Sequence, residues 1–161
     1  MKIKIKQTRQ QDLADIAYLF DAYRVFYKQV SDYDLALKFI TERFENKESV
    51  IFYAINEEGD YLGFTQLFPN FSSVSAQRSW ILNDLFVSPD LRSPGIGTLL
   101  LNKAKEHAIQ TRTKGIGLKT PEDNVRAQAL YESLGYTRNS EFAYYYKAKN
   151  VSEFIRPLQI N

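Results

Sequence analysis

A loop with two closely spaced glycines is the stretch of this sequence best suited to binding a charged ligand. It runs Arg92-Ser-Pro-Gly-Ile-Gly97 and follows an apolar segment over 80–87. Pro94 is typical of the first residue of a helix. A helix start presents unpaired amides and a positive dipole end, which together favour phosphate groups. The glycines alone leave two interpretations open, a phosphate-binding loop and a tight strand-to-helix turn.

One side chain shortly before this loop could move a proton. Asp84 alternates with Leu82 and Phe86, so we predict that all three lie on one apolar face, where a charge is costly unless it is paired. Asp84 is therefore either a base that acts through water or a buried residue that holds a loop. The neighbouring Asn83 cannot take a proton. Farther along the chain, Tyr131 has the spacing of a core residue.

Alternating strands and helices are expected to position these residues. Hydrophobic periodicity predicts strands at 3–5, 50–55, 61–68, 80–87, 116–119 and 142–146. It predicts helices over about 8–27, 31–44, from Pro94 onward, and 125–134, with a capping box at Thr8 and Gln11. This order indicates an α/β (α+β) fold. We expect a mixed, mostly antiparallel sheet of about six to seven strands with helices on both faces.

Composition narrows the possible functions. The chain has 161 residues, which suits one domain, and it contains no cysteine, which excludes disulfides, thiolate zinc sites and cysteine nucleophiles. One histidine, His107, makes a histidine metal site or a Ser/His/Asp triad a poor fit. The net charge is +2 without a basic stripe, so we expect no nucleic-acid partner. No apolar run approaches the length of a membrane span, and we expect a soluble, cytoplasmic protein.

Two motifs in register resemble those of a known family. Arg92-x-x-Gly95-x-Gly97 is similar to the acyl-CoA signature of the GNAT superfamily of N-acetyltransferases, and it follows a strand that reads Asn83-Asp-Leu-Phe-Val87. The segment from Asn124 to Tyr136, which reads Asn-x-x-Ala-x-x-Leu-Tyr-x-x-Leu-Gly-Tyr, resembles the second signature. The order of elements matches over about 1–148. The resemblance implies one GNAT-like domain over 1–148, and the tail, 149–161, lies outside it. Because the segment from Phe154 to Leu158 is apolar, we expect this tail to dock on the domain or on a partner subunit in a homodimer.

The resemblance also implies a cofactor and a mechanism. Acetyl-CoA would lie with its diphosphate on the glycine loop and its pantetheine arm where the 80–87 and 116–119 strands separate. The residues implied to bind it are Phe86, Val87, Arg92, Ser93, Gly95, Ile96, Gly97, Thr98, Asn124 and Tyr131. Tyr131 would hydrogen-bond the departing sulfur, and Asp84 is the second catalytic candidate. Two departures from the family pattern are Pro94, which lacks an amide hydrogen, and Asn83, where many relatives carry a carboxylate.

The acceptor implied by the resemblance is a primary amine. In the family its groove is built from the first two helices and from the loop between long strands, which here carry Tyr23, Phe26, Tyr27, Tyr33, Phe68 and Phe71. We expect Tyr27, Tyr33, Phe71 and Asn83 to contact it. The aromatic rings of this groove would attract an ammonium group. The acceptor could therefore be a small amine, a polyamine, an amino-acid derivative or a protein lysine. The alternative is a non-catalytic acyl-CoA-binding or protein-interaction module.

Overall fold

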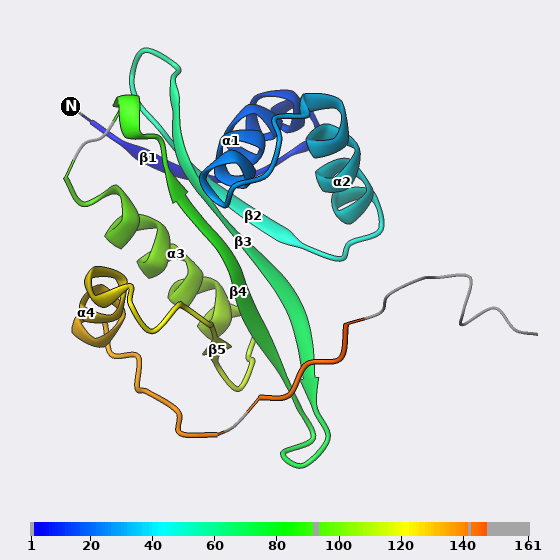
Figure 1. The fold of residues 1–161 in the computed structure, drawn as a ribbon, viewed down its shortest axis with the longest axis vertical. Helices are drawn as coiled ribbons and strands as arrows, with labels where there is room; N and C mark the ends of the chain where they lie inside the picture. Colours follow the sequence, from blue (N-terminus) through cyan, green and yellow to red (C-terminus); the bar gives the residue numbers. More distant parts are fainter. Residues whose placement is uncertain (1, 92–93, 142, 148–161) are drawn as a thin grey trace, which may run out of the picture.

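The computed structural model describes residues 2–91, 94–141 and 143–147. These residues form five strands and four α-helices, which Figure 1 labels in chain order. The strands are β1 (Lys4–Gln7), β2 (Val50–Ile55), β3 (Tyr61–Ser72), β4 (Gln77–Val87) and β5 (Ile116–Gly117). The helices are α1 (Leu13–Phe26), α2 (Tyr33–Glu45), α3 (Ile96–Gln110) and α4 (Val125–Ser133), with short 3-10 turns at Gln10–Asp12 and Pro89–Leu91. Among these described residues, no helix is long and apolar enough to cross a membrane.

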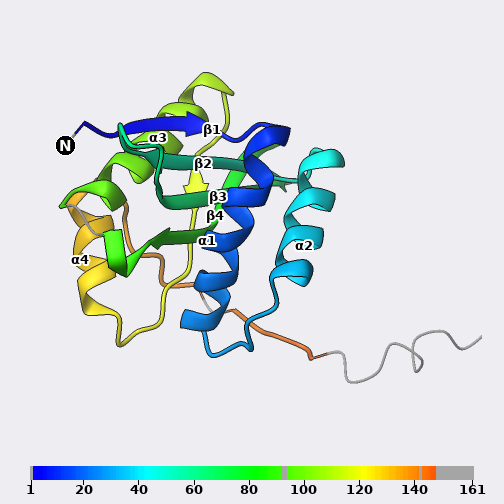
Figure 2. The same ribbon diagram turned by 90° about the horizontal axis from the view of Figure 1, so that it is seen from above.

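One mixed sheet separates the helices into two layers. Its strand order is β1-β2-β3-β4-β5, with antiparallel pairing up to β4 and parallel pairing between β4 and β5. Figure 2 shows α1 and α2 on one face and α3 and α4 on the other. The predicted fold class is confirmed.

A hydrophobic core fills each layer. The first joins α1 and α2 to the sheet through buried residues that include Ile16, Phe20, Ile40, Phe64 and Phe86. The second joins α3 and α4 to the other face and includes Phe52, Leu67, Leu82, Leu100 and the half-buried Tyr131. Burial of these apolar surfaces, at about 25 cal/mol per Å², is the main force that holds both helix layers to the sheet.

The first helix begins later than predicted, because a buried carboxylate organises its start. Asp12 accepts a hydrogen bond from the Arg9 amide at 2.8 Å and from the hydroxyls of Tyr53 and Tyr61 at 3.1 and 3.0 Å. A 3-10 turn therefore precedes α1, which begins at Leu13 and not near Thr8.

The prediction of a last strand at 142–146 is wrong for the residues that can be checked. Residue 142 lies outside the described part, and 143–147 form no strand. Tyr144, Tyr145 and Tyr146 are all largely exposed. β-Propensity requires a neighbouring strand on which to pack, and β5 provides only two residues. The described sheet consequently has five strands, fewer than the six to seven expected. The predicted tail, 149–161, lies outside the described residues.

Candidate active site

A β-bulge shapes the middle of β4. Gln66 on β3 pairs with Asp84, and the next residue, Leu67, pairs with Leu82, so Asn83 has no partner across the ladder. Such an extra residue reverses the alternation of side chains beyond it. Leu82 therefore packs in the α3 core, whereas Asp84 faces α1. The prediction that Leu82 and Asp84 share a face is wrong for this reason.

Asp84 lies on the α1 side in a polar pocket within the core. It is 3% exposed, and its carboxylate accepts hydrogen bonds from Gln66 Nε2 at 2.5 Å and from Asn83 Nδ2 at 3.0 Å. The Tyr23 hydroxyl is a further hydrogen-bonding neighbour. Burial raises the pKa of Asp84 above its ordinary value of 3.8, while the Gln66, Tyr23 and Asn83 donors oppose that rise. The arrangement holds a carboxylate in place with a raised proton affinity, as a general base requires.

Tyr23, which neighbours this carboxylate, lies among further aromatic rings. The Tyr23 ring lies 4.9 Å from the Tyr27 ring and 6.1 Å from the Phe86 ring, measured between centroids. Burial, followed by Asp84, raises the pKa of Tyr23, so its hydroxyl stays protonated. Burial and then the neighbouring Tyr27 raise the pKa of Tyr131 as well. Tyr27, the residue that caps the C-terminal end of α1, and Tyr131 on α4 are therefore close enough for Tyr27 to affect the ionisation of Tyr131.

Part of β4 has a free edge because β4 and β5 separate early. Their pairing consists of Trp80 with Ile116 and Ile81 with Gly117, and β4 continues to Val87 with no strand on this side in the described part of the chain. The backbone groups that would face a further strand are therefore available to an extended ligand. This is the separation of parallel strands that the resemblance implied.

The start of α3 lies beyond the end of β4. Gly95 precedes the helix with φ +87°, a left-handed conformation that favours glycine. The Leu99 amide donates to Gly95 O at 3.0 Å. Ile96, Gly97 and Thr98 form the start of the helix, where amides have no acceptor within the helix itself. The first turn carries no acidic residue. The helix begins at Ile96, two residues later than predicted, and Arg92 and Ser93 lie outside the described residues.

Gly97 is not needed for internal packing. A Cβ built there would meet only Leu130 Cδ2, at the ordinary contact distance of 3.9 Å. Asn124 caps α4, because its side chain accepts from the Ala127 amide at 3.3 Å. Val87 pairs with Gly63 at the end of β4.

The structure brings only part of the predicted acceptor set to Asp84. Asn83 bonds to it directly, and Tyr27 contacts Tyr23. Tyr33 instead stacks on Tyr18 and donates to the Ala14 carbonyl at 3.0 Å. Phe71 lies near the tip of the β3–β4 hairpin under the Arg78 guanidinium, 5.2 Å from its ring centroid.

Two functional candidates were missed by sequence reasoning. Tyr23 was expected in the acceptor groove but not as a partner of Asp84, and Gln66 was not considered. The signal for Gln66 is a glutamine inside the apolar run Leu62 to Phe68, where it is fully buried. Its Oε1 has no hydrogen-bond donor among the described residues, so a bound donor beside Asp84 would complete it.

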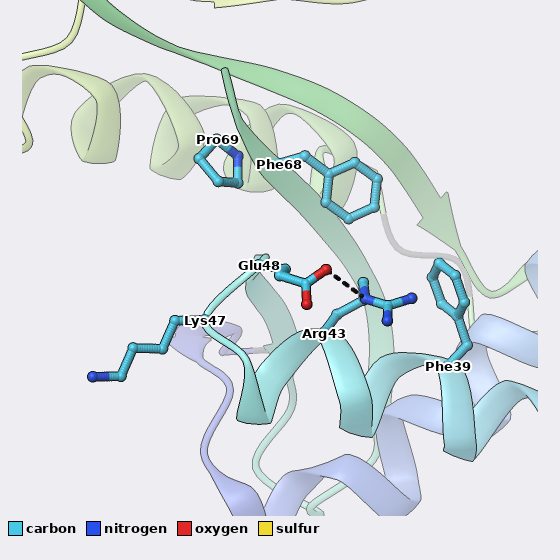
Figure 3. A pocket seen from close by; sticks show the side chains of 6 residues that line it. All are labelled: Phe39, Arg43, Lys47, Glu48, Phe68 and Pro69. Carbon is cyan, nitrogen blue, oxygen red and sulfur yellow. Dashed lines mark ion pairs between the residues drawn. The ribbon is translucent and has the colours of Figure 1, made fainter. Parts of the chain in front are cut away.

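An open pocket of about 470 Å³ lies on the same face, between α2 and β3. Figure 3 shows its lining residues, Phe39, Arg43, Lys47, Glu48, Phe68 and Pro69. Phe68 follows Gln66 by two residues on β3, so the two side chains point to the same side of the sheet.

Comparisons with known proteins find acetyltransferases among the relatives of this chain. The chain is 48% identical over 143 residues to an uncharacterized N-acetyltransferase, YhfO, of Bacillus subtilis, which covers 89% of this chain and 95% of that protein. It is 31% identical over 137 residues to a probable acetyltransferase of Haemophilus influenzae, with 85% and 92% covered. The crystal structure of a probable acetyltransferase superposes with a TM-score of 0.84 at 39% identity and covers 91% of this chain and 98% of that one.

The family comparison covers both helix layers and the sheet between them. The family described as "Acetyltransferase (GNAT) family" matches residues 13–136, from the start of α1 to the end of the second signature. That range includes the bulged strand, the glycine loop and Tyr131. The chain belongs to the GNAT family of acetyltransferases and is an N-acetyltransferase.

Proposed function

We propose that this enzyme transfers the acetyl group of acetyl-CoA directly to a primary amine while both substrates are bound. The observation that carries the proposal is the buried carboxylate of Asp84, held by Gln66 and Asn83 beside Tyr23 at the free edge of β4. A primary alkylamine with a pKa of about 10.4 is almost fully protonated at neutral pH, which costs about 4–5 kcal/mol before it can attack. A fixed base with raised proton affinity addresses that cost.

The residues present fit coenzyme A. The amides at the start of α3 and its dipole suit a diphosphate, and the unpaired edge of β4 near Phe86 and Val87 suits an extended pantetheine arm. Asn124 could reach that arm with the part of its amide not used in capping. Arg92 and Ser93 belong to the same proposed loop. One structural neighbour is the aminoglycoside N-acetyltransferase AAC(6')-Iy in complex with CoA; the match has a TM-score of 0.77 at 18% identity and so shares the fold alone.

Names of more distant relatives support an amine acceptor. They include an L-ornithine N5-acetyltransferase of Arabidopsis thaliana and a D-amino-acid N-acetyltransferase of Saccharomyces cerevisiae, both 30% identical. The aligned parts cover 45% and 50% of this chain and 32% and 50% of those proteins.

The side chains have separate roles in this proposal. Bound acetyl-CoA supplies an activated thioester carbonyl. Asp84 accepts the proton of the acceptor amine, with Tyr23 and Gln66 fixing its carboxylate. Tyr131 donates a hydrogen bond to the departing thiolate, since its raised pKa keeps the phenol protonated. A backbone amide of β4 near Val87 would stabilise the carbonyl oxygen as charge develops on it.

Calorimetric titration with acetyl-CoA tests the cofactor. We expect micromolar binding by the wild-type protein and by Gly97→Ala, because a Cβ at Gly97 has room. Gly97→Glu should abolish binding, since its carboxylate would meet the diphosphate at the start of α3. Absence of wild-type binding, or equal binding by the Glu variant, would overturn the assignment. Binding without turnover of any amine would favour the interaction module. The cytoplasmic location and the homodimer stay predictions.

A further inference from the structure

The segment that carries Tyr131 is braced largely by its own hydrogen bonds. Gln128 Nε2 donates to two carbonyls of the loop before α4, at 3.1 and 2.9 Å. Arg138, beyond the helix, returns to it: its Nη2 donates to Gln128 Oε1 at 3.0 Å and lies 3.7 Å from Glu132 Oε1. Residues 121–138 therefore form a unit that is held together locally.

The apolar face of this unit packs only partly on the rest of the protein. Leu130, Tyr131 and Leu134 lie against the α3 core, and Figure 1 shows α4 beside α3. In the described part of the chain, none of the nine residues of α4 is buried, whereas α3 buries five of its fifteen. Because buried apolar area is what fixes a helix on its neighbours, α4 is attached less firmly than α3.

Tyr131 belongs to the turn that ends α4. Gly135 has φ +91°, and its amide donates to Glu132 O at 3.1 Å. The Tyr136 amide donates to Tyr131 O at 3.0 Å, which completes a Schellman motif. The side-chain contact that usually accompanies this motif is present, since the Tyr136 and Tyr131 rings lie 5.9 Å apart between centroids. The position of Tyr131 is therefore coupled to the position of this helix end.

One hydrogen bond attaches this helix end to α3. Lys105 Nζ donates to Leu134 O at 2.7 Å. The last carbonyls of a helix have no amide donor within the helix, and a cation beside them also favours the negative end of the helix dipole. Among the residues that the structure describes, this is the one hydrogen bond that joins 121–138 to the chain before it.

We propose that Lys105 is a positioning residue for acetyl transfer, which holds the end of α4 on α3 and so keeps the Tyr131 hydroxyl beside the departing sulfur. Its ammonium holds Leu134 O, and the Schellman turn connects that carbonyl to Tyr131, three residues earlier. Without this bond α4 is attached by apolar contacts, which have no preferred direction. This inference rests on the proposed role of Tyr131 and adds a residue outside the cofactor and acceptor sites.

Hydrogen exchange tests whether Lys105 holds the helix. Lys105→Met keeps an apolar stem and loses the donor and the charge. We expect the amides of α4 to exchange about 3- to 10-fold faster in this variant, while those of α3 keep their rates, because an exposed charge-assisted hydrogen bond is a modest restraint. Lys105→Arg should restore the wild-type rates, and Lys103→Met is the matched control, since its ammonium lies 3.4 Å from Glu106 within α3. Unchanged exchange of α4 in Lys105→Met would overturn the proposal.

Kinetics test whether the restraint acts through Tyr131. The rate of CoA release is measured with the fastest of three probe amines, cadaverine, lysine and kanamycin. Lys105→Met should lower kcat by about 3- to 10-fold with the KM for acetyl-CoA unchanged, and Lys105→Arg should restore kcat. In the Tyr131→Phe background, Lys105→Met should change kcat by less than about twofold, because the hydroxyl that Lys105 positions is gone. A full, multiplicative loss in the double variant would show that Lys105 acts elsewhere and refute the assignment.

The two levels of proposal fail differently. Acetyl transfer by the wild-type enzyme with no effect of Lys105→Met on kcat would refute this inference and leave the proposed function intact. A wild-type rate in Tyr131→Phe would refute the role of Tyr131 and this inference with it. Failure of the wild-type protein to bind acetyl-CoA would refute both the proposed function and this inference.

Discussion

Replacement of Asp84 by asparagine separates chemistry from structure at the proposed base. The side chain keeps its size and loses its ability to take a proton. At neutral pH the acceptor amine faces a deprotonation cost of about 4–5 kcal/mol, and a fixed base typically contributes about 10²- to 10⁴-fold. We therefore expect kcat/KM to fall by about 10²- to 10³-fold, equal to about 3–4 kcal/mol at 1.36 kcal/mol per factor of ten.

The fold should tolerate this substitution. In the wild-type protein Gln66 Nε2 donates to the Asp84 carboxylate, and Gln66 Oε1 lacks a donor in the described part of the chain. In Asp84→Asn, rotation of the Gln66 amide would allow Oε1 to accept a hydrogen bond from the introduced asparagine amide. Burial raises the folded-state pKa of Asp84, so between 3.8 and that raised value the folded protein binds more protons than the unfolded chain. Stability contributed by the protonated form is therefore lost as pH rises through this window. Asp84→Asn should consequently melt at the same or a higher temperature at pH 7.

Release of the CoA thiol, followed with a chromogenic disulfide reagent, measures the activity across pH 5.5 to 9. Glu45→Gln, on the exposed end of α2, controls for removal of a carboxylate. A drop in kcat/KM of less than about threefold would refute Asp84 as the base. A fall in melting temperature that parallels the fall in activity would assign Asp84 a structural role instead.

Three further predictions follow from named contacts. Tyr131→Phe should lower kcat by about 10- to 100-fold without changing the calorimetric affinity for acetyl-CoA, whereas Tyr136→Phe should leave kcat unchanged. Gly63→Ala should lower the free energy of unfolding, measured with urea, by about 1–3 kcal/mol, because the added Cβ would meet a β4 carbonyl oxygen at 2.5 Å. Gly117→Ala should leave that free energy unchanged, because a Cβ at Gly117 would have open space around it. Burial and then Lys103 lower the pKa of His107, so the unfolded chain binds the proton more readily. Wild-type urea midpoints should therefore fall as pH drops below about 6.5, and His107→Gln should flatten that dependence.

The helices and strands that bury one face could be predicted from the sequence, because their hydrophobic periodicity reflects that face. The helix ending near 26, the β2–β3 hairpin and α4 all have the expected type, because their apolar spacing matches the sheet face they cover. The helix after the glycines was also predicted, although it begins at Ile96 and not at Pro94. The prediction of a strand at the tyrosine run 144–146 was wrong for the opposite reason, because such a strand would depend on a pairing partner that is remote in sequence.

The candidate site was predicted less completely because it depends on register. Asp84 and Tyr131 were candidates because of their positions relative to the two motifs, and their catalytic roles stay predictions. Their relation to Tyr23 and Gln66 could not be predicted, because one inserted residue in β4 decides which face Asp84 occupies. Periodicity measured along a single strand cannot show an insertion relative to its neighbour. The Arg43–Glu48 pocket joins α2 to β3 and was equally invisible to the spacing within either element.

The bulge also changes the meaning of asparagine at position 83. Asn83 is the extra residue of the bulge and lies just beyond the last β4–β5 pair, where the edge of β4 becomes free. Because Asn83 is inserted there, the side chain of Asp84 faces α1. A carboxylate at 83 would place a second negative charge beside Asp84 and oppose its ionisation further. Asn83 instead donates a hydrogen bond to Asp84 at 3.0 Å and favours the ionised form that must accept a proton. The residue that seemed to weaken the case for carboxylate catalysis thus supports Asp84 as the single base: Asn83→Asp should shift the acid limb of the pH–rate profile to higher pH.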